Sequence, residues 1–573
     1  TSGTRPWELE FKDRGIVMEE WKAEATPKLN DTEPSPPKAE PWTPPLLIDQ
    51  YTTPLIQIAN EIESVPSISS LVECLTGVFR AIELTRVNKE QWKLLRGRCI
   101  MVLRIAANEV LNNGGESYPG LDEATRLLEE KLNEIQERAQ YYNRMDKVLG
   151  FLQHKTISDE IRTLFGGLDT CLARFSYAED VAQEQWIWEF QVVQERESSD
   201  LEHLGHELEK MNMGADVTSE DALKQIIKDK SSILQEQPTT EHAYLNAQRL
   251  VRTILSITKL QLPPMLLTGR QCTVHKNIPL KIGNHCNVYP ALFLGGEKVA
   301  KKIFRLGSSE NNYIEQYATR FLRIAHSWSE LRKSDYILPF YGVGIGAFEG
   351  SYTHPGMYMV TPLMNNRDAM TYLEQYRNRS GMKKHILQII TDAAMGLQYM
   401  HNLHPPFVHS WMRGKNVLIT DSGGAVLGGF GITMASGELG MRAAMMRRGG
   451  DTSPRRWQAP EITSNTNVSR SKTPGDVWGW RVDVPFWAMT TLEIISGSIP
   501  YYMHQRTMAA VMKVHEARPQ RQDYPGMNDY GYRPDEMWAL LERCWDMEPA
   551  NRPTMDEIVA ELEGIARMPE WVP

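Results

Sequence analysis

Between residues 48 and 205, apolar residues recur at three- and four-residue steps, which is the spacing of an amphipathic α-helix. Segments with this spacing begin near Ile68, at Trp92 and at Leu121, and a fourth long segment runs from Ile157 through Trp186 and Trp188. Short polar stretches such as NNGGESYPG separate the segments. Four helices joined by short turns predict an antiparallel helical bundle over residues 48–205.

The flanking segments have other patterns. Residues 1–47 include TPKLNDTEPSPPKAEPWTPP, which is rich in proline and charge and has no apolar period. Such a segment buries too little apolar surface to offset its ordering entropy, so we expect a disordered tail. Two more helical segments fall within residues 206–267, and the proline-rich end of Leu262–Pro264 terminates the second. We expect these two helices to brace the bundle against the following domain.

The most informative stretch is PPFVHSWMRGKNVLITDSGGAVLGGFG, which contains His409, Trp411, Asn416 and Gly429. It resembles the catalytic loop HRDxxxxN and the metal-binding DFG of the protein kinase family. Later motifs of that family follow in order, namely Ala459-Pro460-Glu461, an aspartate at Asp483 and an arginine at Arg552. The PFYG and RPTM motifs are most similar to the tyrosine-kinase-like branch. The resemblance implies a multidomain chain in which an all-α helical bundle precedes an α+β bilobal kinase-like fold over 268–568, with lobes at 268–361 and 365–568.

The resemblance also implies that the chemistry has been lost. An indole, Trp411, takes the place of the catalytic base, and Gly429 takes the place of the metal-binding aspartate. Counting from the LPFYG strand puts Ile324 where the glutamate partner of the strand lysine, Lys302, would stand. Loss of a positioned base alone costs roughly 10² to 10⁴ in rate. Asp421 is no substitute, because TDSGG has the composition of a turn between two strands.

Nucleotide binding is left open by these residues. The proline at 362 in the hinge offers no amide to an adenine ring, and Cys286 stands where the third glycine of the phosphate-covering loop belongs. By resemblance, a retained site would use seven residues: Gly283, Val288, Ala300, Lys302, Met364, Asn416 and Leu418. We expect ATP binding to be weak and metal-independent if it occurs, with no required cofactor and no metal site.

Other family residues are expected to have structural or regulatory roles. The resemblance implies that His409, Phe430, Glu461, Asp483 and Arg552 support the fold rather than the chemistry. Thr452 and Ser453 lie among four arginines in the activation segment, so their phosphorylation would create charge-assisted pairs that order it. The alternative is a solvated loop.

Composition narrows the class of protein. The six cysteines include no CxxC pair, which favours a reducing compartment over a zinc or disulfide framework. No run of 18 apolar residues and no secretory signal is present, so we expect a cytoplasmic protein that is at most peripheral to a membrane. The net charge of −9 argues against nucleic acid as a partner. The chain begins at Thr1, which leaves its natural N-terminus open.

The bundle ahead of a kinase-like domain is similar to the N-terminal domain of the mixed-lineage-kinase-domain-like family, around RAIELTRVNKEQWKLLRGRC. That resemblance implies an effector bundle, which engages membranes or self-associates and is restrained by the kinase-like domain. Residues 48–210 contain 17 basic and 28 acidic residues, a net of −11, which disfavours binding to an anionic leaflet. A local stripe of Arg86, Lys89, Lys93 and Arg96, with Arg98 and Arg104 nearby, is the exception. Its alternative is a solvated face paired to Glu83 and Glu90.

These observations favour a pseudokinase that acts through contacts in signalling, with a bundle that is an effector in cell death or defence. Its expected partners are other signalling proteins, among them an upstream kinase, and further copies of the bundle. Two alternatives stay open, a weak or unconventional protein kinase and a passive scaffold.

Overall fold

The computed structural model describes the greater part of the chain from residue 55 to residue 569. The described residues are 55–63, 65, 68–112, 120–145, 150–151, 153–175, 183–210, 219–235, 240–258, 260, 266–267, 271–274, 278–282, 286–304, 328, 331, 334–348, 351–409, 411–429, 456–459, 461, 479–503 and 518–569. The predicted tail, 1–47, lies outside them.

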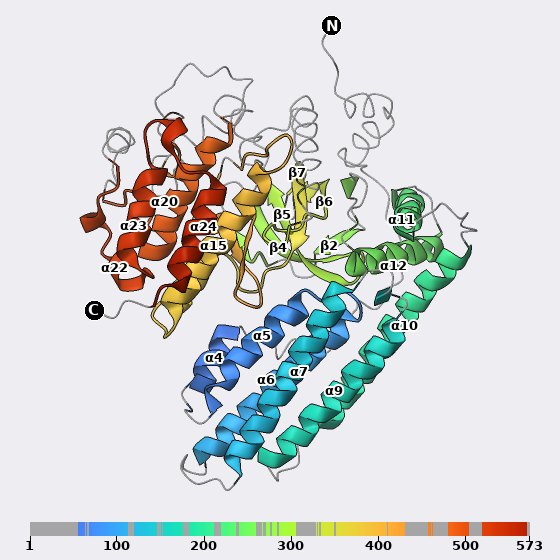
Figure 1. Ribbon diagram of the computed structural model, residues 1–573. Coiled ribbons are helices and arrows are strands. Elements are labelled where there is room, and N and C mark those ends of the chain that lie inside the picture. Colours follow the sequence, from blue (N-terminus) through green and yellow to red (C-terminus); the bar gives the residue numbers. More distant parts are fainter. Residues whose placement is uncertain are drawn as a thin grey trace.

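The N-terminal part is a bundle of helices, as the apolar spacing predicts (Figure 1). The helices are α4 (Leu55–Glu63), α5 (Leu71–Glu83), α6 (Lys89–Asn112), α7 (Leu121–Arg144), α9 (His154–Phe175) and α10 (Gln183–Lys210). α5 packs on α7, and α6 packs on α9. Side chains at the predicted apolar positions fill the core; Leu75, Trp92 and Leu128 are fully buried.

The prediction of one long fourth helix was wrong. Instead of one helix from Ile157 through Trp188, the structure has α9, which ends at Phe175, and α10, which begins at Gln183. The two share the same apolar core, since Phe165 of α9 lies 6.0 Å from Trp186 of α10, measured between ring centroids. Continuous apolar periodicity therefore reflects one common core rather than one continuous helix. α10 also runs past the expected domain boundary at residue 205.

Two further helices, α11 (Ser219–Gln235) and α12 (Glu241–Ile257), pack on each other, and α12 also packs on α10. Thr240 caps α12 by accepting a hydrogen bond from the Ala243 amide at 3.3 Å. Buried residues of α12, including Leu250 and Ile254, belong to one apolar cluster that contains both bundle residues and sheet residues such as Phe293 and Val299. α12 therefore connects the bundle core to the sheet core.

The sheet has seven strands in the order β1-β6-β7-β5-β4-β2, with β3 paired to β4. Its strands are β1 (Leu266–Leu267), β2 (Cys272–Val274), β3 (Lys281–Ile282), β4 (Cys286–Phe293), β5 (Glu297–Phe304), β6 (Gly342–Phe348) and β7 (Ser351–Pro362). The antiparallel register places Val288 opposite Lys302 and Ala300 opposite Thr361. The expected strand-turn-strand around the phosphate-covering position is therefore β3 and β4.

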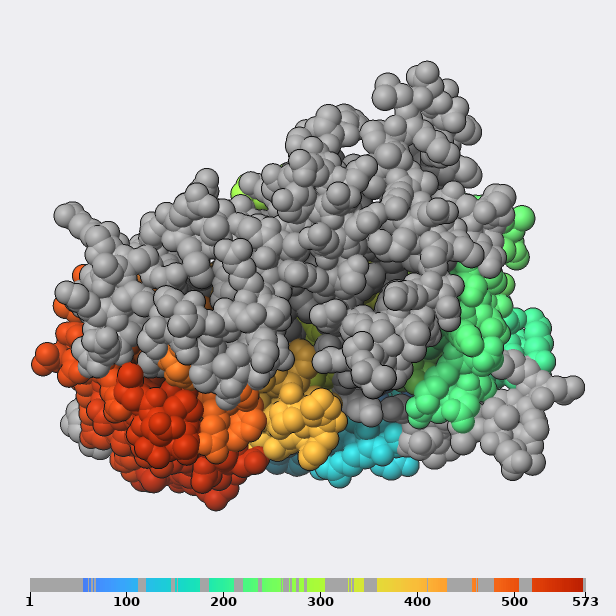
Figure 2. All heavy atoms as spheres, turned by 90° about the horizontal axis from the view of Figure 1, so that it is seen from above, coloured from blue at the N-terminus to red at the C-terminus, as the bar shows by residue number. Residues whose placement is uncertain are grey.

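The second lobe is mainly helical and has its own apolar cluster. Its elements are α14 (Ala369–Tyr376), α15 (Met382–His401), β8 (Val417–Ile419), β9 (Ala425–Leu427), α20 (Asp483–Ser496), α22 (Gly526–Tyr530), α23 (Pro534–Cys544) and α24 (Met555–Arg567), with 3₁₀ turns at Gly414–Asn416, Gly479–Val482, Arg521–Asp523 and Pro549–Asn551. Viewed from above, the C-terminal helices (orange to red) and the bracing helices (green) lie at opposite ends of the molecule (Figure 2). The predicted class, a helical bundle followed by a bilobal fold, is confirmed.

Within the described residues, no helix combines the length and the hydrophobicity that a membrane crossing requires. The described residues also contain no group of three or more side chains suited to hold a metal ion.

Candidate functional site

The Asp483 carboxylate, at the start of α20, anchors the start of the segment from His409 to Asn416 by hydrogen bonds. The fully buried Asp483 Oδ2 accepts hydrogen bonds from the His409 amide at 2.7 Å and from His401 Nε2 at 3.0 Å. Burial of a carboxylate is tolerated when it is hydrogen-bonded in this way. Asp483 therefore positions the loop rather than taking part in chemistry.

The His409 ring connects the loop to the end of β9. Its Nδ1 accepts a hydrogen bond from the Trp411 amide at 3.2 Å, so the proton must be on Nε2, which donates to the Gly428 carbonyl at 3.1 Å. Complete burial lowers the pKa of His409, and the nearby Asp483 only partly offsets this. A neutral imidazole with both nitrogens engaged serves as a structural link.

Trp411 occupies the position of the catalytic base as a buried side chain, 8% exposed. The Arg413 guanidinium lies 5.8 Å from the centre of its ring, and no described residue accepts a hydrogen bond from the indole Nε1. Neither group can accept a proton from a substrate hydroxyl, because an indole only donates and an arginine stays protonated. The position is thus filled with apolar and cationic groups.

The metal-binding position is closed as well. Gly429 has a φ of +83°, and a Cβ added there would lie 2.5 Å from Cγ of Asn416. The Asn416 amide in turn donates to the Trp411 carbonyl at 2.8 Å. Under 3.0 Å a carbon contact forces a neighbour to move, so the space beside Gly429 is taken by the amide of Asn416. A side chain at position 429 would therefore require the Asn416 amide to move and to give up its hydrogen bond to the Trp411 carbonyl.

Two nearby aspartates could be considered as substitutes, and both are engaged elsewhere. Asp368 caps α14 by accepting from the Thr371 amide at 3.1 Å, and its other oxygen pairs with Lys281 of β3 at 3.1 Å. Asp421 lies in the turn between β8 and β9, as predicted, and its carboxylate faces the bundle. Neither approaches the loop as a base.

The start of β4 packs against the second lobe at the expected nucleotide cleft. Cys286, at the start of β4, packs against the apolar cluster of the second lobe together with Met364 and Leu418. The ion pair between Lys281 and Asp368 joins the same two lobes. Val288 lies on β4, and Ala300 and Lys302 lie on β5. Cys286 is thus in apolar contact where a kinase would have a glycine of the phosphate-covering loop, and the nucleotide-binding role of these residues stays a prediction.

Several of the predicted site residues lie outside the described part of the chain. They are Gly283, Ile324, Phe430, Thr452 and Ser453.

The structure contains the ion pair between Glu461 and Arg552 in the second lobe. Arg552 makes two hydrogen bonds to Glu461, at 2.7 Å and 2.8 Å, one to each carboxylate oxygen. Arg552 is 3% exposed and also donates to the carbonyl of Asp546. This fork geometry is the strongest that an arginine can make with a carboxylate.

An unpredicted contact lies at the turn that joins β8 to β9, the hairpin between Asn416 and Gly429. Glu83, the last residue of α5, accepts hydrogen bonds from the Thr420 hydroxyl at 3.2 Å, the Asp421 amide at 3.1 Å and the Ser422 hydroxyl. Burial raises the pKa of Glu83, and the hydrogen bond from Ser422 opposes that rise. One bundle carboxylate thereby satisfies three donors of the turn.

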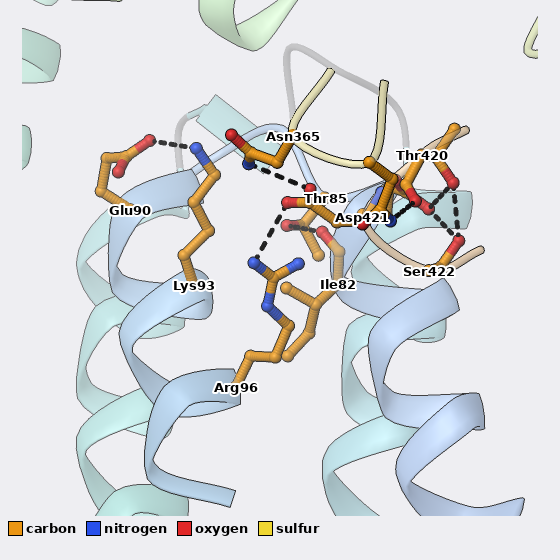
Figure 3. Close-up of polar contacts among 11 residues, drawn as sticks. Ile82, Thr85, Glu90, Lys93, Arg96, Asn365, Thr420, Asp421 and Ser422 are labelled. Atoms are coloured by element: carbon orange, nitrogen blue, oxygen red, sulfur yellow. Dashed lines mark hydrogen bonds and ion pairs between the residues drawn. The ribbon is translucent and has the colours of Figure 1, made fainter. Parts of the chain in front are cut away.

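A second bundle residue completes this contact. Arg96 Nη2 lies 3.3 Å from Asp421 Oδ2, and Asn365 donates to the other oxygen at 3.2 Å (Figure 3). Burial alone would raise the pKa of Asp421, but Arg96 and Asn365 bring it below its ordinary value. Asp421 is therefore ionised and paired. We call these residues, Glu83, Arg96, Asn365, Thr420, Asp421 and Ser422, the docking cluster.

The predicted basic stripe is consequently not an open face. Arg96 is 7% exposed because it points to Asp421, and the fully buried Arg98 donates to Asp169 at 3.0 Å within the bundle. Lys93 pairs with Glu90 at 2.8 Å, as the alternative expected (Figure 3). Glu83 makes its hydrogen bonds to the turn, and Arg96 is close enough to lower its pKa in part. The membrane contact expected through Arg86, Lys89, Lys93 and Arg96 stays a prediction, and Arg96 is covered in this arrangement. The stripe is also shorter than the spacing predicts, because Arg86 lies in the turn before α6 (Lys89–Asn112) and not on the helix. Residue spacing on one helix identified the stripe but could not show what covers it.

Taken together, the bilobal fold, the catalytic-loop geometry and the Glu461–Arg552 pair define a protein kinase domain. Residues 274–562 match the family model described as protein tyrosine and serine/threonine kinase. This chain belongs to the protein kinase family.

Individual relatives agree with this assignment. The chain is 28% identical over 207 residues to the human serine/threonine-protein kinase TNNI3K, covering 36% of this chain and 22% of the relative. It is 26% identical over 281 residues to the human proto-oncogene tyrosine-protein kinase ROS, covering 47% and 10%. It is 25% identical over 224 residues to the serine/threonine-protein kinase STY17 of Arabidopsis thaliana, covering 38% and 34%. The chain thus spans about a third or less of the length of each relative.

Proposed function

We propose that this member of the protein kinase family is a pseudokinase whose kinase-like domain controls the N-terminal bundle through the docking cluster. One observation carries the proposal: the turn of the hairpin between Asn416 and Gly429 is held by Glu83 and Arg96 of the bundle. A hairpin that ordinarily positions catalytic groups here positions a second domain.

The loss of activity rests on the replaced groups. Phosphoryl transfer needs a group that orients or deprotonates the hydroxyl and a metal that neutralises the phosphates. Trp411 and Gly429 supply neither, and Asn416 fills the remaining space. Removing charge stabilisation of the phosphoryl group costs on the order of 10² to 10³ beyond the loss of the base. ATP then acts at most as a weak, metal-independent ligand.

Catalysis is tested by incubating the purified chain with labelled ATP and either magnesium or manganese. We expect no transfer above that of the Lys302→Met variant. Transfer that Lys302→Met abolishes would instead establish the alternative, a weak or unconventional protein kinase. A thermal-shift titration with ATP, with and without metal, measures nucleotide binding separately from turnover.

The bundle is proposed to be the effector, by its resemblance to the mixed-lineage-kinase-domain-like family, in a cell-death or defence response. The docking cluster supports restraint, because its contacts cover Arg96 of the basic stripe. Glu83→Lys places a cation against Arg96 and removes the acceptor of the turn. We expect this variant to self-associate or to release dye from anionic vesicles more than the parent chain does. Glu134→Lys, which reverses an exposed charge on α7, is the matched control.

A passive scaffold is the remaining alternative. It predicts that Glu83→Lys changes neither self-association, measured by light scattering, nor vesicle leakage, while partner binding to the bundle persists. Activation-segment phosphorylation at Thr452 and Ser453 by an upstream kinase is proposed as the signal that changes docking. Alanine at both positions with no effect on docking would remove that part of the proposal.

A further inference from the structure

Two hydroxyl groups of the turn between β8 and β9 face one carboxylate of the bundle. Thr420 donates to Glu83 Oε2 at 3.2 Å, and the Ser422 hydroxyl donates to the same oxygen. The two hydroxyl oxygens are themselves 3.0 Å apart (Figure 3). Ser422 is 8% exposed in this arrangement. Any group added to the Ser422 oxygen would therefore have to displace Glu83.

The charges near Ser422 are already mostly negative. Burial, and to a smaller extent the charge of the adjoining Asp421, raise the pKa of Glu83. Arg96, whose Nη2 lies 3.3 Å from Asp421 Oδ2, is a cation that acts on both carboxylates. A phosphoserine carries about −1.5 to −2 charges at pH 7. At position 422 it would leave this guanidinium facing three anionic groups, and like charges placed together oppose docking.

The backbone of the turn is held by the kinase-like domain and not by the bundle alone. The Thr420 amide donates to the Gly424 carbonyl at 2.9 Å, and the Gly423 amide donates to the Thr420 carbonyl at 3.0 Å. Asn366 Nδ2 also donates to the Thr420 carbonyl, at 2.6 Å. Withdrawal of Glu83 would thus remove the acceptor of the two hydroxyls and leave these backbone contacts in place.

We propose that a separate protein kinase phosphorylates Ser422 with ATP, and that the phosphoryl group keeps the bundle released from the turn. In this step a bond forms between the Ser422 oxygen and the γ-phosphorus of ATP, and the bond from that phosphorus to the departing ADP breaks. The base of the acting kinase takes the hydroxyl proton. Because Glu83 covers the hydroxyl in the docked turn, the released turn is the substrate. The inference rests on the proposed role of the docking cluster and adds a means of regulating it.

Phosphoserine encoded at position 422 during bacterial expression of the full chain tests the release directly. The readout is hydrogen–deuterium exchange of the Asp421 amide, which donates to Glu83 Oε1 at 3.1 Å. We expect this amide to exchange at least about tenfold faster in the phosphorylated chain than in the parent chain. Exchange at the parent rate would overturn the proposal.

Two controls separate the effect of the charge from other effects. Ser422→Ala removes the hydroxyl without adding charge, and its exchange should stay closer to the parent rate, because Thr420 and the Asp421 amide still donate to Glu83. Phosphoserine at position 380, an exposed serine of the same lobe, is the matched control with unchanged exchange. Release by Ser422→Ala as complete as that by phosphoserine would refute the electrostatic argument.

Access to the site is tested by phosphopeptide mass spectrometry of chains expressed in yeast. Glu83→Lys should carry at least about tenfold more phosphate at Ser422 than the parent chain, because the released turn is the substrate. Equal occupancy in the two chains, or no phosphate at Ser422 in Glu83→Lys, would contradict the proposal. Neither experiment measures self-association or dye release, so failure of the bundle as an effector is distinguishable from failure of this site.

Discussion

Arg96 and Asp421 are 325 positions apart in the chain, and Arg96 Nη2 lies 3.3 Å from Asp421 Oδ2. One belongs to the bundle and the other to the turn of the hairpin between Asn416 and Gly429. Their pairing makes the hairpin a contact between two domains. The geometry around it, in which Glu83 satisfies the turn, predicts strong coupling between these residues.

A charge swap measures that coupling. Arg96→Asp and Asp421→Arg should each lower the free energy of unfolding by about 1–3 kcal/mol, because each leaves a partly buried charge next to a like charge. The double variant should recover at least half of the combined loss, since the pair is restored in reverse. Chemical denaturation of the four proteins gives the coupling energy.

Arg126→Asp provides the control for the charge swap, because Arg126 is exposed and pairs only along its own helix with Glu130. It should change the stability by less than about 0.5 kcal/mol. Additive losses in the double variant would show that Arg96 and Asp421 do not interact in solution.

The packing of Asn416 against Gly429 predicts a second coupling. Gly429→Ala should destabilise the domain by about 1–3 kcal/mol, because a Cβ there meets the Asn416 amide and the backbone has a positive φ. In an Asn416→Ala background the steric part should disappear and the cost should fall by about half. Thermal melting of the four proteins reports the difference. A cost that stays the same would mean that Asn416 does not occupy this space.

For the same reason, restoring acidic residues should not restore activity. We expect Trp411→Asp combined with Gly429→Asp to show no phosphoryl transfer above background with labelled ATP, because the second aspartate has no room beside Asn416. Measurable transfer by this double variant, lost again in Lys302→Met, would contradict the steric argument.

Arg552 should be one of the most sensitive positions in the second lobe. Arg552→Ala should cost about 3–5 kcal/mol, because it leaves the Glu461 carboxylate and the Asp546 carbonyl without their donor in a buried site. Arg567→Ala removes an exposed pair with Glu563 and should cost less than about 0.5 kcal/mol. Comparable melting temperatures for the two variants would refute the structural role.

The partly buried Glu197 predicts a pH dependence. It accepts hydrogen bonds from the amides of Glu90 at 2.8 Å and Gln91 at 3.2 Å, at the start of α6. Burial, and next the charge of Glu90, raise its pKa to about 7. Since the folded protein then holds this proton more tightly than the unfolded chain, the stabilisation is complete below the ordinary value near 4.5 and is lost as the pH rises through 7.

Melting curves of the parent chain and Glu197→Gln between pH 5 and pH 8 test this dependence. The stability of the parent relative to the variant should fall by about 2–3 kcal/mol over that range, because glutamine has no proton to lose. A difference that is constant with pH would show that Glu197 does not titrate in this window.

The sequence predicted local structure better than contacts between distant parts. The apolar spacing located the cores of α5, α6 and α7, and motif order placed Glu461, Asp483 and Arg552 in one domain, because these features depend on local periodicity or on a fixed fold. The break between α9 and α10 escaped prediction because both helices contribute to the same core. Asp421 was correctly assigned to a turn, but nothing in TDSGG identifies a partner on another domain.

The spacing of the basic residues did not show which of them are covered, for a physical reason. The spacing predicts that Arg86, Lys89, Lys93 and Arg96 share one helical face, but α6 begins at Lys89 and Arg86 lies in the turn before it, and a sequence does not show which tertiary partners such residues have. Only Lys93 has a neighbour on the same helix, Glu90.

The apolar cluster that runs from the bundle through α12 into the seven-stranded sheet has a consequence for unfolding. Leu250 and Ile254 lie in the same buried network as Leu75 of the bundle and Val299 of the sheet, whereas the helices of the second lobe form a different network. The bundle therefore shares its core with much of the sheet, whereas Val343 and Met359 of the sheet pack with the helices of the second lobe. Heating should melt the bundle and the sheet in a single calorimetric step.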